Sequence, residues 1–447
     1  MLLTRIEEMV PGAVDAQRRL LADHGKKVAA TVTVEQVLGG LAGAKVLKSF
    51  IPGSPHFVDP EESLHVGGVG IFDICRTHTF EWLIWNLYTG TPPTAEQEEW
   101  VRGRLEQARK NLMTGPFYSR VSDFLLANAR FLDPMKAIDG ALALLAEDSR
   151  MARKVATGDI REITWQDRLE DQLDILGFLS VITPLVYRAK YGGAQSMDEF
   201  RTDLRFAQAF VSGLGIADGD EQSVQMARVV DQLMATMCYH GPGNVSTFDA
   251  IVASSGGANP FEVFGAMVGG LRGFNHGGAA EQGVRFLFSL RDDERYGVEA
   301  SLEALEQLAA LRILDHKLPI WCVGHRVIRG KKGDQRANAT IATLREMFPD
   351  DAFFALALRW YEGAKKMVDQ HTGSKFPDVN VDGYTGLLAH LCGIIAEPRM
   401  APYAGAFFAT SRASGVFAET FWQAVGPLRL LRPSAHTEQS IELLPAA

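Results

Sequence analysis

The sequence predicts an all-α protein with a small amount of β structure near its N-terminus. Apolar residues recur at spacings of three and four along most of the chain, which is the pattern of helices that bury one face. Short β-type runs do not alternate with these stretches, so a doubly wound sheet is not expected. The length of 447 residues and the 47% of hydrophobic residues suit a globular protein of two or three domains, or of one large domain with a smaller attached lobe.

The strand candidates come early in the chain, and the helix candidates follow them. The segments Val28–Val34 and Phe57–Gly68 lie between Gly and Pro residues and are the best strand candidates. Asn259-Pro260 and Ser301 have the form of helix starts. The last apolar stretch is rich in small residues, so we expect a helix that is buried on most sides. Apolar stripes predict helices over residues 230–237, 260–271, 302–308, 351–370 and 401–422.

Charge and cysteine usage exclude several classes of protein. The net charge of −9, from 45 basic and 54 acidic residues, argues against binding to nucleic acid or to an anionic membrane. No stretch approaches the roughly 20 apolar residues of a membrane span. The N-terminal 20 residues resemble neither a signal peptide nor a transit peptide. Because the four cysteines lie far apart in the sequence, we expect no disulfide framework and predict a reducing, cytoplasmic location.

Four segments interrupt the helical pattern with Gly, His and charged residues. A single His in a Gly-rich loop is usually a hydrogen-bonded structural residue, and Asn380–Gly383 alone would be interpreted as a turn. Arg412 lies in an apolar helix, where a buried guanidinium must either form an ion pair or bind an anion. The four segments are His240–Thr247, Gly273–Gly278, Gly324–Val327 followed by Asp334–Arg336, and Pro377–Tyr384.

In this order, the segments resemble those of the citrate synthase family. The similarity runs from about Thr31 to Pro433. The matching motifs are His-x-x-x-Asn-x-Ser from His240, Gly-x-x-His-Gly around His276, Gly-His-Arg-Val around His325, Asn-Val-Asp ending at Asp382, Ser-Arg-Ala around Arg412, and Arg432-Pro433.

The resemblance implies a citrate synthase-like fold and a homodimer, and it leaves assembly beyond the dimer open. Each subunit would have a large helical domain (1–276 and 385–447) and a small helical domain (277–384), with the active site in the cleft between them. The implied reaction joins an acyl-CoA such as acetyl-CoA to oxaloacetate and releases CoA from the citrate or alkylcitrate product. The CoA thioester is a co-substrate, and no permanently bound cofactor or metal is expected.

The resemblance also assigns roles to single residues. Asp382 would be the base that removes the α-proton of the thioester, because desolvation can make a carboxylate basic enough. His276 would hydrogen-bond the thioester oxygen, and His325 would donate to the carbonyl oxygen of the 2-oxo acid. The residues implied to hold oxaloacetate are His240, Arg336, Arg412 and, from the other subunit, Arg432; those implied to contact CoA are Arg161 and Lys375.

Two departures from the family pattern leave alternatives open. His325 and Arg336 are eleven positions apart, two more than in the usual family form, which resembles the citryl-CoA lyase branch. Gly383 follows the proposed base where a common bacterial form has Phe, so we expect an acyl pocket that also accepts propionyl-CoA. Another interpretation takes two His and one Asp as an Fe(II) site. A non-catalytic family member is disfavoured, because an idle site has no reason to retain buried charges.

Overall fold

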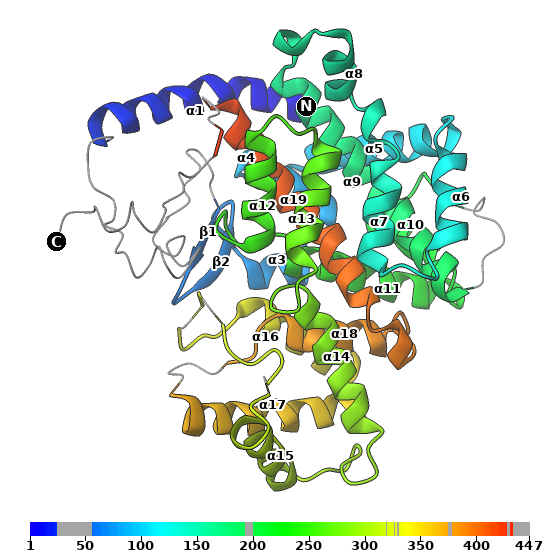
Figure 1. Ribbon diagram of the computed structural model, residues 1–447, viewed down its shortest axis with the longest axis vertical. Helices are drawn as coiled ribbons and strands as arrows, with labels where there is room; N and C mark the ends of the chain where they lie inside the picture. The colour runs from blue at the N-terminus through cyan, green and yellow to red at the C-terminus, as the bar shows by residue number, and fades with distance from the viewer. Residues whose placement is uncertain are drawn as a thin grey trace, which may run out of the picture.

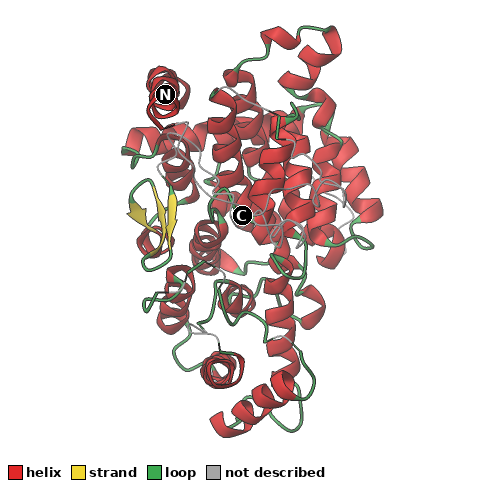
Figure 2. Ribbon diagram, turned by 60° about the vertical axis from the view of Figure 1, so that its left-hand side comes forward, coloured by secondary structure: helices red, strands yellow, loops and turns green. Residues whose placement is uncertain are grey.

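The computed structural model describes residues 1–24, 56–192, 200–318, 320–325, 327–328, 330–373, 378–426 and 430–431. Helices make up most of this part of the chain, and a small sheet lies at one edge of the molecule (Figures 1 and 2). The predicted all-α class with minor β structure is confirmed. No helix among the described residues is long and apolar enough to cross a membrane.

The α-helices occur along the whole of the described chain. Those of the first half are α1 (Leu2–His24), α3 (Ile71–Thr77), α4 (Phe80–Thr89), α5 (Ala95–Thr114), α6 (Tyr118–Asn128), α7 (Pro134–Ala143), α8 (Arg150–Thr157), α9 (Trp165–Tyr187), α10 (Phe206–Leu214) and α11 (Gly219–Met237). Those of the second half are α12 (Val245–Ser255), α13 (Pro260–Leu271), α14 (Gly278–Arg291), α15 (Leu302–Leu314), α16 (Gln335–Met347), α17 (Ala352–Thr372), α18 (Asp382–Leu391) and α19 (Tyr403–Val425).

The sheet is a three-stranded antiparallel ribbon in the order β1-β2-β3. Its strands are β1 (Phe57–Asp59), β2 (Ser63–Val66) and β3 (Val69–Gly70), with Val58 opposite Leu64 and Val66 opposite Val69. The strand prediction for residues 57–68 is therefore confirmed. The other strand candidate, residues 28–34, lies outside the described residues.

Local capping explains why the predicted helices begin where they do. The side chain of Asn259 accepts hydrogen bonds from two backbone N–H groups in the first turn of α13, and Pro260 is its first residue. Ser301 accepts from the backbone N–H of Ala304 at the start of α15. Asp351 does the same for Phe354 in α17. These caps satisfy N–H groups that have no partner within the helix.

The core is centred on α9 and α19. Every residue of α19 from Tyr403 to Trp422 is buried, as expected for a helix surrounded by others. In Figure 1, α15 and α17 lie at one end of the molecule, and α16 and α18 lie between them and the main body. The predicted boundary after residue 276 falls in the turn before α14, whereas the boundary after residue 384 falls within the first turn of α18.

Candidate active site

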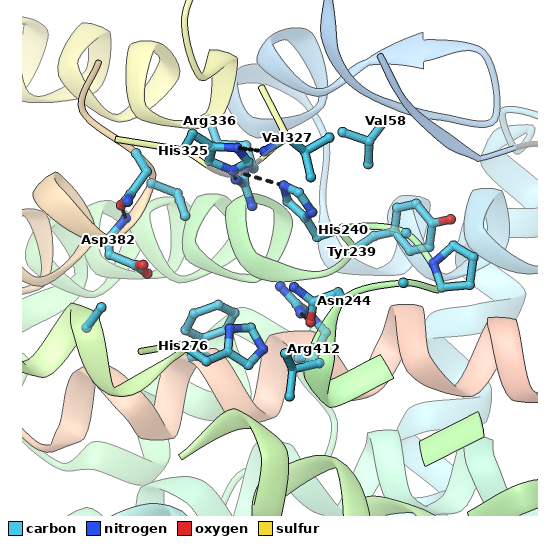
Figure 3. Close-up of a pocket in the computed structure, with 18 of the residues that line it drawn as sticks. Val58, Tyr239, His240, Asn244, His276, His325, Val327, Arg336, Asp382 and Arg412 are labelled. Carbon is cyan, nitrogen blue, oxygen red and sulfur yellow. Dashed lines mark hydrogen bonds between the residues drawn. The ribbon is translucent and has the colours of Figure 1, made fainter. Parts of the chain in front are cut away.

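A cavity of about 810 Å³ opens between the main body and the α14–α18 region (Figure 3). Its walls come from β1, the loop that follows α11, the turn before α14, the loop before α16, the start of α18, and α19. Side chains that are far apart in the sequence therefore meet here. Six of the predicted site residues line it, namely His240, His276, His325, Arg336, Asp382 and Arg412.

Asp382 is the first residue of α18, and its side chain points into the cavity (Figure 3). The turn expected for this segment is present, because the backbone N–H of Gly383 donates to Asn380 O at 3.1 Å, and it leads directly into the helix. The carboxylate atom Oδ1 is buried and has no hydrogen-bond partner. Desolvation raises the pKa of Asp382 to about 7, although the positive charge of Arg336 opposes the shift. The carboxylate is therefore poised to exchange a proton near neutral pH.

Backbone contacts fix the tautomer of His325. Its Nδ1 accepts hydrogen bonds from the N–H groups of Val327 at 3.0 Å and Ile328 at 2.7 Å. In a neutral imidazole the other nitrogen must then carry the proton, so Nε2–H is a donor. This donor faces His240 Nε2 at 3.1 Å across the cavity (Figure 3). Burial, followed by the charge of Arg336, holds the pKa of His240 well below its usual range, so His240 is a neutral acceptor.

His276 lies beside Arg412 on the other side of the cavity (Figure 3). Its Nε2 lies 3.1 Å from the hydroxyl oxygen of Ser246, which donates to Asn244 Oδ1 at 2.8 Å. Burial, with a smaller effect of Arg412, lowers the pKa of His276 to about 3. The imidazole is therefore neutral at physiological pH and can act as a hydrogen-bond donor without carrying a charge.

The two buried arginines differ in their partners. Arg336 forms a two-point ion pair with Asp334, through Nε at 2.9 Å and Nη2 at 2.7 Å. Arg412 is 1% exposed and forms no ion pair among the described residues. Its guanidinium donates to neutral oxygens, those of Met237, Asn244 and Ser246. Burial and the nearby Arg336 lower the pKa of Arg412 to about 9.

An unpaired, buried guanidinium is costly unless an anion binds to it. Of the two explanations left open for Arg412, the structure rules out an ion pair within the described part of the chain and favours an anionic ligand. The cavity therefore offers a binding site for a carboxylate next to a basic carboxylate and two neutral imidazoles.

Of the other three predicted site residues, only Arg161 is among the residues that the structure describes. Arg161 is exposed in a short 3₁₀ segment, Ile160–Glu162, and does not line the cavity of its own chain. Lys375 and Arg432 lie outside the described residues.

Sequence reasoning missed two buried residues around the cavity. His56 lines it, and Asp334 holds both Arg336 and the backbone N–H of Val381, at 3.1 Å. Asp334 lies in the charged segment Asp334–Arg336 noted in the sequence, but the groups to which it hydrogen-bonds are known only from the fold. Nothing in the sequence indicates a role for His56, except that it lies just before a predicted strand.

The expected space beside Gly383 is not present. A Cβ atom at this position would lie 2.5 Å from Val379 Cγ1 and 3.2 Å from Tyr361 Cζ. The hydroxyl of Tyr361 donates to Gly383 O at 3.1 Å, and neither residue lines the cavity. The expectation that Gly383 enlarges the acyl pocket is therefore wrong, because the tyrosine ring and the valine fill the space that a side chain at position 383 would need.

The Fe(II) interpretation gains no support from the side chains. Among the described residues, no group of three or more His, Cys, Asp or Glu side chains is arranged to hold a metal ion. His240 and His325 contact each other, and Asp382 lies apart from both (Figure 3).

Comparison with known proteins gives one consistent result. Residues 40–434 match the family model described as citrate synthase, C-terminal domain. The chain is 28% identical to the peroxisomal citrate synthase of Saccharomyces cerevisiae, over 98% of this chain and 92% of the relative. It is 27% identical to the mitochondrial 2-methylcitrate synthase of Yarrowia lipolytica, with the same coverage. Because these relatives are peroxisomal and mitochondrial, they contradict the prediction of a cytoplasmic location.

Solved structures share the fold. Citrate synthase from Thermotoga maritima superposes with a TM-score of 0.69 at 22% identity, over 89% of this chain and 95% of its own. A ternary complex of citrate synthase from Thermoplasma acidophilum with carboxymethyl coenzyme A and oxaloacetate also gives 0.69, at 20% identity, over 88% and 93% of the two chains.

Proposed function

The chain belongs to the citrate synthase family, and from this we propose that its cavity is the site at which an acyl-CoA is joined to oxaloacetate. The protein is an acyltransferase that condenses the two substrates to citrate or an alkylcitrate and releases CoA. The observation that carries the assignment is Arg412, a buried cation without a counter-ion in the described part of the chain, next to the proton-accepting carboxylate of Asp382. A dicarboxylate with a reactive carbonyl suits this combination of charges.

Arg336 and Arg412 bind the carboxylates of oxaloacetate. The planar guanidinium group can donate two parallel hydrogen bonds to a carboxylate, which fixes the orientation of the substrate. Asp334 holds the guanidinium of Arg336 through two of its nitrogens, so less conformational freedom is lost when the substrate binds. His240 lines the cavity as a neutral residue and contributes a further polar contact.

Asp382 and His276 generate the enol of the thioester. Asp382 removes the α-proton, which a carboxylate with a pKa of about 7 does more readily than one of ordinary basicity. His276 donates a hydrogen bond to the thioester oxygen as negative charge develops there. For this, the proton of the neutral ring must be on Nδ1, so the hydroxyl of Ser246 turns from Asn244 and donates to Nε2.

His325 assists formation of the carbon–carbon bond. The enol carbon attacks the carbonyl carbon of oxaloacetate, and its oxygen acquires negative charge. The Nε2–H of His325 is a donor because two backbone N–H groups occupy Nδ1. It therefore donates to this oxygen. Hydrolysis of the resulting citryl thioester then releases CoA.

The remaining assignments are carried over from the family. Arg161 and Lys375 contact CoA, and Arg432 reaches the oxaloacetate site from the other subunit of a homodimer. The division into a large domain (1–276 and 385–447) and a small domain (277–384) places the cavity at their junction. The similarity to a 2-methylcitrate synthase supports the use of propionyl-CoA as well as acetyl-CoA.

A thiol-release assay with oxaloacetate and a panel of acyl-CoAs tests the proposal. We expect release that depends on both substrates, with acetyl-CoA and propionyl-CoA within about tenfold of each other in kcat/KM, a gap of about 1.4 kcal/mol. Arg412→Gln should lose activity, whereas Arg295→Gln, at a side chain that is 77% exposed, should not. Cleavage of citryl-CoA without measurable condensation would instead identify a lyase, and no activity in either direction would contradict the proposal.

A further inference from the structure

The loop between His325 and Arg336, which is longer than in the usual family form, docks onto the turn that joins β1 and β2. The backbone N–H of Gly330 donates to Pro60 O at 2.8 Å. The ammonium of Lys332 donates to Glu62 at 2.5 Å, and the backbone N–H of Gln335 donates to the hydroxyl of Ser63 at 3.2 Å. We call this contact the clasp; it comprises Pro60 and Glu62 on the turn, Ser63 at the start of β2, and Gly330, Lys332 and Gln335 on the loop.

Gly330 makes the closest approach in the clasp. A Cβ atom at this position would lie 2.4 Å from Glu61 O and 2.6 Å from Glu61 Cα. These are backbone atoms, which cannot turn away as a side chain would. Any residue other than glycine at position 330 must therefore push the loop away from the turn.

The loop is braced so that such a movement reaches the site. The side chains of Gln335 and Asn338 both donate to Lys332 O, at 2.6 and 2.9 Å, which ties the loop to the first turn of α16. On its other side, Gly333 packs against Asp378, where a Cβ atom would lie 1.9 Å from Oδ2. The loop is thus held between the ribbon and the segment that leads to Asp382, and it leads directly into Arg336.

The other end of the ribbon is anchored in the main body by His56. The ring accepts the N–H of Gly67 at Nδ1, at 3.0 Å, and therefore donates from Nε2 to Leu87 O, at 2.7 Å. Burial lowers the pKa of His56 to about 4, which keeps it in this neutral form. Its ring packs edge-on against Tyr239 at 5.4 Å, next to His240. The ribbon therefore connects the His240 side of the cavity to the loop that carries His325 and Arg336.

We propose that the clasp positions His325 and Arg336 against His240 across the cavity, with Gly330 as the positioning residue. The clasp fixes this edge of the cavity, so the 2-oxo acid half of the site is held together before substrate binds. Gly330 and Lys332 act through the two site residues and do not touch the substrate. The expected change in the KM for oxaloacetate rests on the proposed condensation, whereas the contact between the loop and the ribbon does not.

Gly330→Ala tests the inference, with Gly103→Ala as the matched control because no atom lies within 4 Å of a Cβ at position 103. Gly330→Ala should raise the KM for oxaloacetate about tenfold, the effect of losing about 1.4 kcal/mol of binding, and should also lower kcat, because the displaced loop carries His325 as well as Arg336. In the substrate-free enzyme, hydrogen exchange of the backbone amides in residues 327–336 should become faster. The Gly103→Ala variant should match the wild type in both measurements.

A charge exchange at the surface provides a second test, in which the double variant controls for misfolding. The side chains of Lys332 and Glu62 are 61% and 52% exposed. Lys332→Glu should raise the KM for oxaloacetate about two- to fivefold, a small effect as expected for an exposed ion pair. The double variant Lys332→Glu with Glu62→Lys should restore the wild-type value.

Each outcome bears on the clasp. An unchanged KM and unchanged exchange in Gly330→Ala would overturn the inference, as would a fall in kcat with constant KM, because displacement of Arg336 must weaken the binding of oxaloacetate. Failure of the double variant to restore KM would exclude the ion pair from the clasp. A wild-type protein without condensation activity would remove the proposed function, but hydrogen exchange would still decide whether the clasp orders the loop.

Discussion

Replacement of Asp382 by Asn should abolish condensation and stabilise the protein at the same time. Asn has nearly the same shape but cannot accept the α-proton, so kcat should fall about 10²–10⁴-fold. The pKa of Asp382 is raised from 3.8 to about 7, chiefly by desolvation. Each unit corresponds to about 1.4 kcal/mol, so keeping this carboxylate ionised in the fold costs up to about 4 kcal/mol above pH 7. Asn removes that cost.

The pH dependence of the stability gain follows from the direction of the shift. Between about pH 4 and pH 7 the folded carboxyl holds a proton that the unfolded chain has lost, so the stability of the wild type declines as the pH rises through this window. The free energy of unfolding of Asp382→Asn should therefore equal that of the wild type near pH 4 and exceed it by about 2–4 kcal/mol near pH 8, after allowance for water reaching the site.

Thermal or urea denaturation at several pH values measures this difference. Asp315→Asn, at an exposed carboxylate near the end of α15, is the matched control and should show no such trend. The wild-type kcat/KM should in turn fall about tenfold per unit as the pH drops below about 7, because the base becomes protonated. A stability difference that does not change with pH would refute the desolvated carboxylate, and activity of the Asn variant above a tenth of wild type would refute its role as base.

Three further predictions concern substrate binding, the acyl pocket and the dimer. Arg336→Lys should raise the KM for oxaloacetate about 10–100-fold, because an ammonium cannot form a two-point contact with a carboxylate, and should leave acetyl-CoA binding nearly unchanged. Steady-state kinetics with each substrate varied in turn will measure both KM values. Gly383→Ala should lower the free energy of unfolding by about 1–3 kcal/mol, because the new methyl group clashes with Val379. A change in the preference for acetyl-CoA over propionyl-CoA would contradict the finding that this residue lies outside the acyl pocket. Mixing Asp382→Ala and Arg432→Ala subunits should restore about a quarter of wild-type activity, since half of the dimers are hybrids with one complete site each; no recovery after proven subunit exchange would contradict a contribution of Arg432 across the dimer.

Features that depend on neighbouring residues in the sequence were predictable. The starts of α13 and α15 follow from Asn259 and Ser301, whose side chains cap the turn that comes directly after them. The buried character of α19 follows from its small and apolar residues. The β structure predicted at residues 57–68 follows from a β-type run between glycines and prolines. In each case, one short segment carries the whole signal.

Features that depend on contacts between distant segments were not predictable. The anchor at His56 needs Leu87 and Gly67 in place, and nothing in the sequence near His56 indicates them. The error at Gly383 has a geometric cause, since successive residues of a helix point about 100° apart. Asp382 therefore faces the cavity, and position 383 faces Tyr361. A motif shows which residue types belong together, but the helix phase decides which of them reach the substrate.

The most direct test of the condensation is identification of its product. Wild-type protein with isotopically labelled acetyl-CoA and oxaloacetate should form labelled citrate and free CoA thiol in equal amounts by mass spectrometry and thiol titration, and Asp382→Asn should form neither. Thiol release without labelled citrate would show hydrolysis of the thioester instead of carbon–carbon bond formation, and would contradict the assignment of Asp382, His276 and His325 to a condensation.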